Sequence, residues 1–301
     1  MSTTRLTLST CGLRRSALCL SRPLSQRAFL STSGRASHNV ASSTSLKSLN
    51  AVYNSRLTLP PRSNGLIRNV STGPGAAAET YVAYGMTQKL FEACSSQADY
   101  QVPQATQKGV EVPMTDSGEH LGVSDSWWYR ELGLVPTFST WSQITFLHMY
   151  LLTVRLRALP TRESVQTYSR HLIDHFSHNA EHRMDVLHDI GSRSIRNKYL
   201  KDLFIQWRGI IAAYDEGLAK GDAVLGAAVW RNLWKANSVG ADGNDIDWTK
   251  VAWVVTYMRR VLSELSKMQE ADMVFALSKG SIQESGIFGY SPADKRMAGG
   301  K

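Results

Sequence analysis

The sequence predicts an all-α fold, and three observations lead to that prediction. From Ser124 onward, apolar side chains recur at three- and four-residue spacing, as they do on the buried face of a helix. Pro160 is the only proline between residues 137 and 291. No stretch of useful length alternates apolar and polar side chains as a half-buried strand does. We therefore expect a single helical domain of about five main helices, preceded by a disordered N-terminal region.

Start and stop signals place the five helices. Ser139 or Thr140 can cap the first helix, and Pro160 ends it. Thr161 opens the second helix, which should run to about residue 189. The other three are expected over residues 194–217, 222–234 and 248–276, with Asp247 as the candidate cap of the last one.

One run needs a membrane check, because residues 132–154 contain no Asp, Glu, Lys or Arg. These 23 residues are long enough to span a bilayer. Pro136, Gln143, His148 and several hydroxyl side chains nevertheless make the run polar, and its apolar residues fall on one helical face. We therefore expect a buried core helix here rather than a transmembrane helix.

The positive charge of the chain is concentrated near its N-terminus. The formal net charge is +9, yet the first 78 residues hold ten Arg or Lys and no Asp or Glu. The remaining residues carry 24 basic and 25 acidic side chains, which sum to −1, so the folded part is not a basic nucleic-acid-binding domain. The expected organisation is a mitochondrial presequence over 1–36, a disordered basic arm and linker over 37–123 with a short helix near 85–96, the helical domain over 124–290, and a tail over 291–301.

Residues 1–36 have the composition of a mitochondrial transit peptide. Six arginines interrupt their short apolar runs, so the continuous apolar core of a secretory signal is missing. The negative potential of the matrix draws such a cationic segment inward. Cys11 and Cys19 would be removed with this segment, and Cys94 alone could form no internal disulfide.

Four histidines form a stripe on the second expected helix. His171, His175, His178 and His182 lie at i, i+4, i+7 and i+11, nearly opposite the apolar side chains of the same helix. We expect them to face solvent or a partner. A solvated face is the favoured interpretation, and a docking face or a metal site are the alternatives. One helix supplies only two ligands at a single point, so a metal site would need further residues.

A second surface of interest is a basic run at the start of the third expected helix. It consists of Arg193, Arg196, Lys198, Lys201 and Arg208. Interleaved aromatic residues can indicate RNA binding, but Tyr199, Phe204 and Trp207 lie on the apolar stripe and are expected in the core. The run is thus either a solvated helix face or a patch that meets phosphates or a partner.

The sequence contains no motif for catalysis or for cofactor binding. It lacks a Gly-rich phosphate loop, a GxSxG motif and a nucleophile with a plausible base. Asp242 begins a pattern that resembles a calcium loop, but Asp247 and Trp253 stand where that loop needs Gly and Glu. We therefore expect neither enzymatic activity nor a cofactor.

Several runs in the helical region resemble the ubiquinol–cytochrome c chaperone family, in its fungal form. They are WSQITFLH (141–148), HLIDHF (171–176), IRNKYLKDL (195–203), YDEGL (214–218) and AAVWRN (227–232). The resemblance implies a non-enzymatic factor for assembly of respiratory complex III. It implies that the protein pairs with a small assembly factor, lies near the exit of the mitochondrial ribosome tunnel and holds newly made cytochrome b. It also implies a peripheral position on the matrix side of the inner membrane.

The resemblance transfers no binding role to a single side chain, so the partner surface must come from the residues themselves. The candidates are Arg193, Arg196, Lys198, Lys201, Arg208, His175 and His182. Two other functions stay open at this point. One is a metal-dependent mitochondrial enzyme that uses the histidine stripe from His171 to His182, and the other is an RNA-binding translational activator.

Overall fold

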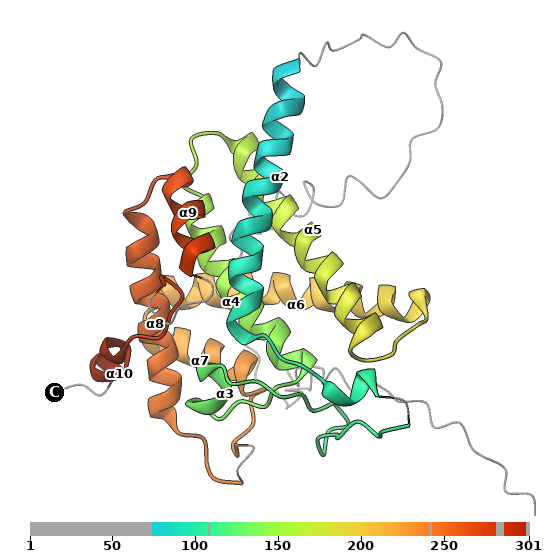
Figure 1. Cartoon of the computed structure of the whole chain (residues 1–301). Coiled ribbons are helices and arrows are strands. Elements are labelled where there is room, and N and C mark those ends of the chain that lie inside the picture. The colour runs from blue at the N-terminus through green and yellow to red at the C-terminus, as the bar shows by residue number, and fades with distance from the viewer. Residues whose placement is uncertain (1–73, 108, 241–242, 281–285, 299–301) are drawn as a thin grey trace, which may run out of the picture. The chain divides into compact units, whose positions relative to one another are not determined.

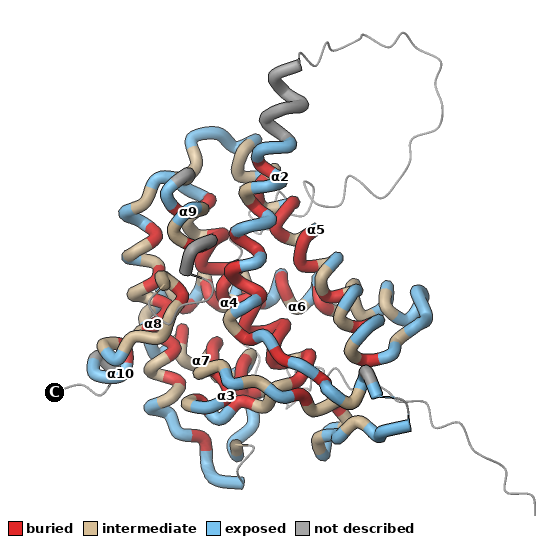
Figure 2. Tube along the Cα trace, in the orientation of Figure 1, coloured by how far each residue is buried: buried red, intermediate tan, exposed pale blue. Residues whose placement is uncertain are grey.

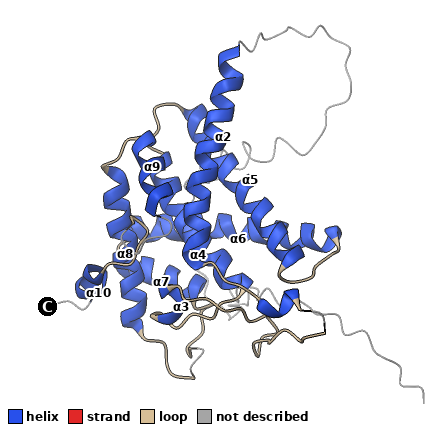
Figure 3. Ribbon diagram, in the orientation of Figure 1, coloured by secondary structure: helices blue, strands red, loops and turns tan. Residues whose placement is uncertain are grey.

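The computed structural model describes residues 74–107, 109–240, 243–280 and 286–298, which form helices and loops with no β-strand among them (Figures 1 and 3). The all-α fold is confirmed: the first four expected helices are present as α4 to α7, and the fifth is present as α8 and α9. The expected presequence and most of the basic arm, residues 1–73, lie outside the described residues. The α-helices are α2 (Pro74–Ser95), α3 (Trp127–Arg130), α4 (Phe138–Leu156), α5 (Arg162–Val186), α6 (Arg193–Lys220), α7 (Asp222–Leu233), α8 (Trp248–Ser266), α9 (Glu270–Gly280) and α10 (Pro292–Ala298).

Helix α4 forms the centre of the core and is buried along almost its whole length (Figure 2). It packs against α5, α6, α7 and α8. Thr137 caps it by accepting a hydrogen bond from the Thr140 amide at 3.3 Å, so the helix begins slightly before the expected cap. No helix in the described part of the chain is long and apolar enough to cross a membrane. The uncharged run over 132–154 therefore belongs to the core, as expected.

Helices α6 and α7 cross at a very short distance. A Cβ atom on Gly217 of α6 would lie 2.6 Å from the Cα of Leu225 on α7, so only glycine fits at this crossing. Gly221, with a φ of 110°, ends α6 and allows α7 to begin at the next residue. Trp230 of α7 is half-buried against Trp248, with ring centroids 5.5 Å apart.

The long last helix expected over 248–276 is divided into α8 and α9. Arg155 of α4 provides the physical reason for the break. Its guanidinium donates to the carbonyl oxygens of Leu265 and Met268 at 3.1 and 2.6 Å, which satisfies groups that a continuing helix would have used. The turn allows Met273 and Leu277 of α9 to be buried in the core.

The disordered arm and linker expected over 37–123 is wrong for the part of it that the structure describes. Leu90, Cys94 and Tyr100 are fully buried, and the short helix expected near 85–96 is the C-terminal part of the 22-residue α2. The glycines of this stretch occupy turns and close contacts: Gly109 and Gly118 have positive φ values, and Gly122 lies against Tyr100. A Cβ atom on Gly122 would lie 2.6 Å from the Tyr100 ring, because residues 101 and 123 form a bridge at this point.

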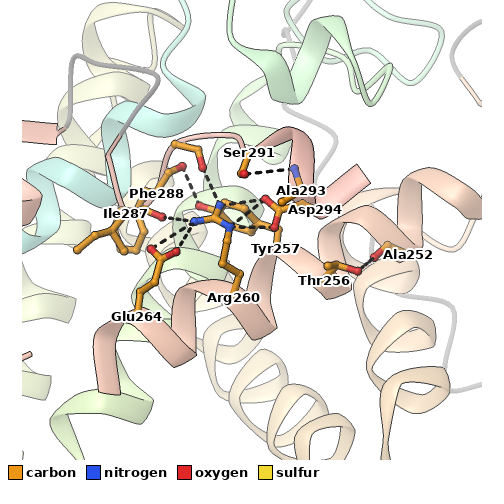
Figure 4. Close-up of polar contacts among 11 residues, drawn as sticks. Ala252, Thr256, Tyr257, Arg260, Glu264, Ile287, Phe288, Ser291, Ala293 and Asp294 are labelled. Carbon is orange, nitrogen blue, oxygen red and sulfur yellow. Dashed lines mark hydrogen bonds and ion pairs between the residues drawn. The ribbon is translucent and has the colours of Figure 1, made fainter. Parts of the chain in front are cut away.

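The tail expected over 291–301 contains α10, which is bound to α8 (Figure 4). Arg260 of α8 donates to both carboxylate oxygens of Asp294, at 2.8 and 3.0 Å. The same guanidinium donates to the carbonyl oxygens of Ile287 and Gly289 at 3.2 and 2.8 Å. Residues 292–298 of the expected tail are therefore part of the folded domain, because a buried ion pair fixes them to α8.

Candidate docking surface

The histidine stripe of α5 divides into a buried pair and an exposed pair. His171 and His175 pack against Tyr84 of α2, with ring centroids 5.3 and 4.4 Å from the tyrosine ring. His175 Nε2 lies 3.3 Å from the Tyr84 carbonyl oxygen, and burial lowers the pKa of both histidines. The expectation that they face solvent or a partner is wrong, because α2 covers this side of α5.

His178 and His182 remain exposed further along α5. Among the described residues, no group of three or more His, Cys, Asp or Glu side chains could hold a metal ion. The buried pair therefore serves the contact between α2 and α5. Of the two histidines proposed for docking, His182 lies on the surface and His175 does not.

Arg196 is also used within the fold. Its guanidinium forms ion pairs with Glu181 at 3.2 Å and Asp185 at 2.8 Å, both on α5. It donates as well to the carbonyl oxygens of Ile190 and Gly191, at 2.8 and 3.0 Å, in the loop before α6. These contacts fix the end of α5 to the start of α6, so this guanidinium is not available to a partner.

The other four cations of the basic run lie on the surface of α6. Arg193, Lys198, Lys201 and Arg208 are exposed, and none forms an ion pair with a described residue. Asp202 is the one acidic residue between positions 193 and 208. This half of the helix therefore presents a concentrated positive charge, whereas Lys220 at the other end is neutralised by Glu216 at 2.6 Å.

Apolar side chains adjoin these cations. Ile205 is 67% exposed and Phe204 is 38% exposed. Phe204 borders a small hollow, partly open to solvent, between α4, α5 and α6. The hollow is lined by Phe146, Ile173, Phe176, Ser177, Leu200, Leu203, Phe204 and Trp207. We use the name α6 face for the exposed side chains of residues 193–212.

The aromatic residues of the basic run offer little to a nucleic acid base. Trp207 is buried and lies against Phe146, with ring centroids 5.5 Å apart, as expected for a core residue. Tyr199 is half-buried. Phe204 lies at the rim of the hollow and not in the core, which differs from the expectation.

Ile205 is the feature of this surface that the sequence interpretation missed. Leu203, Trp207 and Ile210 form the buried stripe of α6, and Ile205 lies roughly on the opposite side of the helix. A plot of the apolar residues around the helix axis would have identified Ile205. It lies among lysine and arginine side chains and away from the buried stripe.

Comparison with known proteins agrees with the resemblance found in the sequence. The family model described as ubiquinol-cytochrome C chaperone matches residues 130–277. Protein CBP3, mitochondrial, from Saccharomyces cerevisiae is 37% identical over 169 residues, which cover 56% of this chain and 48% of that protein. Ubiquinol-cytochrome c reductase complex assembly factor 1 from Drosophila melanogaster is 26% identical over 142 residues, covering 46% of this chain and 52% of that protein. The chain thus spans about half the length of these two relatives.

Two further similarities extend beyond fungi and insects. Ubiquinol-cytochrome-c reductase complex assembly factor 1 from Xenopus laevis is 24% identical over 146 residues, which cover 48% of this chain and 68% of that protein. The crystal structure of the Cbp3 homolog from Brucella abortus has a TM-score of 0.46 and 16% identity, covering 66% of this chain and 90% of that one. The matched family is one of chaperones and not of enzymes. Residues 130–277 of the chain form a domain of the ubiquinol–cytochrome C chaperone family.

Proposed function

We propose that this chain is a mitochondrial chaperone for the assembly of respiratory complex III. The observation that carries the proposal is the match of residues 130–277 to the chaperone family. One relative is named as mitochondrial, and two are named as assembly factors of the ubiquinol–cytochrome c reductase complex. The ten basic residues and the absence of acidic ones in the first 78 residues support import into mitochondria.

Within this role, we propose that the chain binds newly synthesised cytochrome b as a heterodimer with a small complex III assembly factor. We place it near the exit of the mitochondrial ribosome tunnel, peripherally on the matrix side of the inner membrane. The α6 face supports a binding role, because its cations have no described ion-pair partner and Ile205 is 67% exposed. A chaperone that acts by binding needs such a surface and no catalytic cleft.

Two other functions have less support. A metal-dependent enzyme built on the histidine stripe would need His171 and His175 as ligands, but both pack against α2. An RNA-binding activator could use the cations of α6, but bases need aromatic faces to stack on. Trp207 is buried, and Phe204 is only 38% exposed at the rim of the hollow. The family match also favours neither function.

Deletion of the gene tests the coarse proposal. We expect complex III, measured on native gels and by the absorbance of cytochrome b, to be lost while the ATP synthase remains. Re-expression of the full chain should restore complex III. A normal level of complex III after deletion would contradict the proposal.

Recovery of partners tests the finer proposal. The tagged full chain is isolated from detergent-solubilised mitochondria after a short radioactive pulse of mitochondrial translation. Labelled cytochrome b, one small protein and ribosomal proteins should be recovered. Isolation of the same tag on an unrelated matrix protein is the control. Stoichiometric bound metal would favour an enzyme instead, and salt-sensitive crosslinked RNA would favour an RNA-binding activator.

A further inference from the structure

The exposed side of α6 carries a regular stripe of residues. Lys198, Lys201, Ile205, Arg208 and Ala212 follow one another at alternating three- and four-residue spacing, and all five are exposed. Side chains at this spacing form one nearly straight row on a helix. The 14 steps from the first residue to the last correspond to about 21 Å of helix, at roughly 1.5 Å for each residue. The row is long enough for about four turns of a second helix.

The fold itself does not account for the cations near the N-terminus of α6. The N-terminus of a helix has a partial positive charge, so a cation in its first turn is unfavourable. The first turn of α6 contains Arg193 but no acidic residue, and Ser192 makes no capping hydrogen bond. Arg196 is explained by its contacts with α5. Arg193 and Lys198 have no comparable partner among the described residues.

The residues in the middle and at the end of the row would allow the backbone of a second helix to come close to α6. Ile205 offers an apolar side chain that is 67% exposed. Gly209 and Ala212, one and two turns further on, are exposed and small, and no heavy atom lies within 4 Å of the Cβ position of Gly209. Small side chains allow two helix axes to approach to the short end of the usual range of about 8–10 Å.

We propose that the α6 face binds an acidic amphipathic helix of a partner protein. The acidic side chains of that helix lie opposite Lys198, Lys201 and Arg208, and one of its apolar side chains packs on Ile205. This inference rests on the proposed function, since it names the kind of partner that the chaperone engages through this surface.

Two other classes of partner fit the same surface less well. RNA would meet the cations, but it would leave Ile205 in contact with phosphates and would find Trp207 buried. An anionic membrane would need a continuous apolar face to insert, whereas Lys198, Lys201 and Arg208 lie among the exposed apolar side chains of α6, Ile195, Phe204 and Ile205. An amphipathic helix with acidic and apolar side chains on one face can pair with the cations and also pack on Ile205.

Zero-length crosslinking with a carbodiimide tests the inference on the native complex. The tagged full chain is purified with its partners from detergent-solubilised mitochondria, treated with the carbodiimide and digested for mass spectrometry. Lys198 and Lys201 should form amide bonds with Asp or Glu side chains of one partner protein. The crosslinked acids should be three, four or seven residues apart in that partner.

Substitutions that place a negative charge on the α6 face test the inference quantitatively. Lys201→Glu and Ile205→Asp should each lower recovery of the crosslinked partner by about tenfold, since each places a repulsive or unpaired charge in the contact. Lys267→Glu, an exposed lysine at the end of α8, is the matched control and should leave recovery unchanged. Unchanged melting temperatures establish that the variants fold.

The results separate this inference from the proposed function. Full recovery of every partner by Lys201→Glu and Ile205→Asp overturns the inference, and so do crosslinks of residues 193–208 to RNA alone. If deletion of the gene still removes complex III, the proposed function stands in either case. Conversely, crosslinks to an acidic helix together with normal complex III after deletion would support the surface and contradict the function.

Discussion

Arg260 and Asp294 form a bidentate ion pair in which the carboxylate is only 2% exposed. The two residues are 34 positions apart, on α8 and α10, and the arginine also binds two carbonyl oxygens of the segment between them (Figure 4). Tyr257, three residues before the arginine, donates to the Phe288 carbonyl oxygen at 3.0 Å. Buried polar contacts thus fix the C-terminal segment to the domain, although this segment lies beyond the region that the family model matches.

Removal of the carboxylate should destabilise the domain strongly. Asp294→Ala leaves the Arg260 guanidinium largely buried beside Glu264 alone, and we expect a loss of about 3 kcal/mol in the free energy of unfolding. Asp222→Ala is the matched control, because Asp222 also pairs with an arginine of α8, at 2.7 Å, but is 66% exposed. Its loss should cost less than about 1 kcal/mol. Urea denaturation measures both, and equal losses would contradict the assigned role of burial.

The crossing of α6 and α7 makes a second prediction. Gly217→Ala places a methyl group 2.6 Å from the Leu225 Cα, so the helices must separate, and we expect a loss of about 1–3 kcal/mol. Gly209→Ala, on the same helix, has no heavy atom within 4 Å and should stabilise the domain by about 0.5–1 kcal/mol. Thermal unfolding of the two variants compares them directly. A stabilised Gly217→Ala would show that the close approach is not needed.

The start of a helix could be predicted from the sequence where it depends on a capping residue next to it in the chain. Thr161 and Asp247 accept hydrogen bonds from the Ser164 and Thr249 amides, as residues at those positions can do without help from distant parts of the chain. The break between α8 and α9 was not predictable in the same way. It depends on Arg155, which is 110 residues from the Leu265 carbonyl that it binds.

The same distinction between local and distant determinants applies to the surface residues. The exposure of Lys198, Lys201 and Arg208 follows from their angular positions around α6, so the sequence alone was enough to predict it. The burial of His175 depends on α2, which the sequence suggested only as a short helix in a linker. A helical wheel describes one helix, and it contains no information about what another helix covers.

Two buried histidines predict a loss of stability in mild acid. Burial lowers the pKa of His188 from its usual 6.5 to about 3, aided by the nearby His120 and Arg183. Burial also lowers the pKa of His148 from 6.5 to about 4. Above pH 6.5 both histidines are neutral in the folded and unfolded states, so stability does not change there. As the pH falls below 6.5, only the unfolded chain takes up the protons, and stability decreases.

The expected size is about 2 kcal/mol for each histidine between pH 6.5 and pH 5, since each pH unit in this window costs about 1.4 kcal/mol. Urea denaturation at pH 7.5, 6 and 5 measures the total. His188→Gln should lose less stability than the wild-type chain over the same interval, because one of the buried histidines with a lowered pKa is gone. A profile that is identical in the two chains would contradict a buried neutral His188.

The last prediction separates structure from docking within the basic run. Arg196→Gln removes contacts with Glu181, Asp185 and two carbonyl oxygens, so we expect a loss of about 1–3 kcal/mol in the free energy of unfolding. Lys198→Gln removes the same charge from an exposed residue with no described ion pair, and stability should change by less than about 0.5 kcal/mol. Recovery of the partner should nevertheless decrease for Lys198→Gln. Urea denaturation and quantitative pull-down on both variants make the comparison. A destabilised Lys198→Gln with full partner recovery would reverse the two roles, because the lysine would then belong to the fold and not to the docking surface.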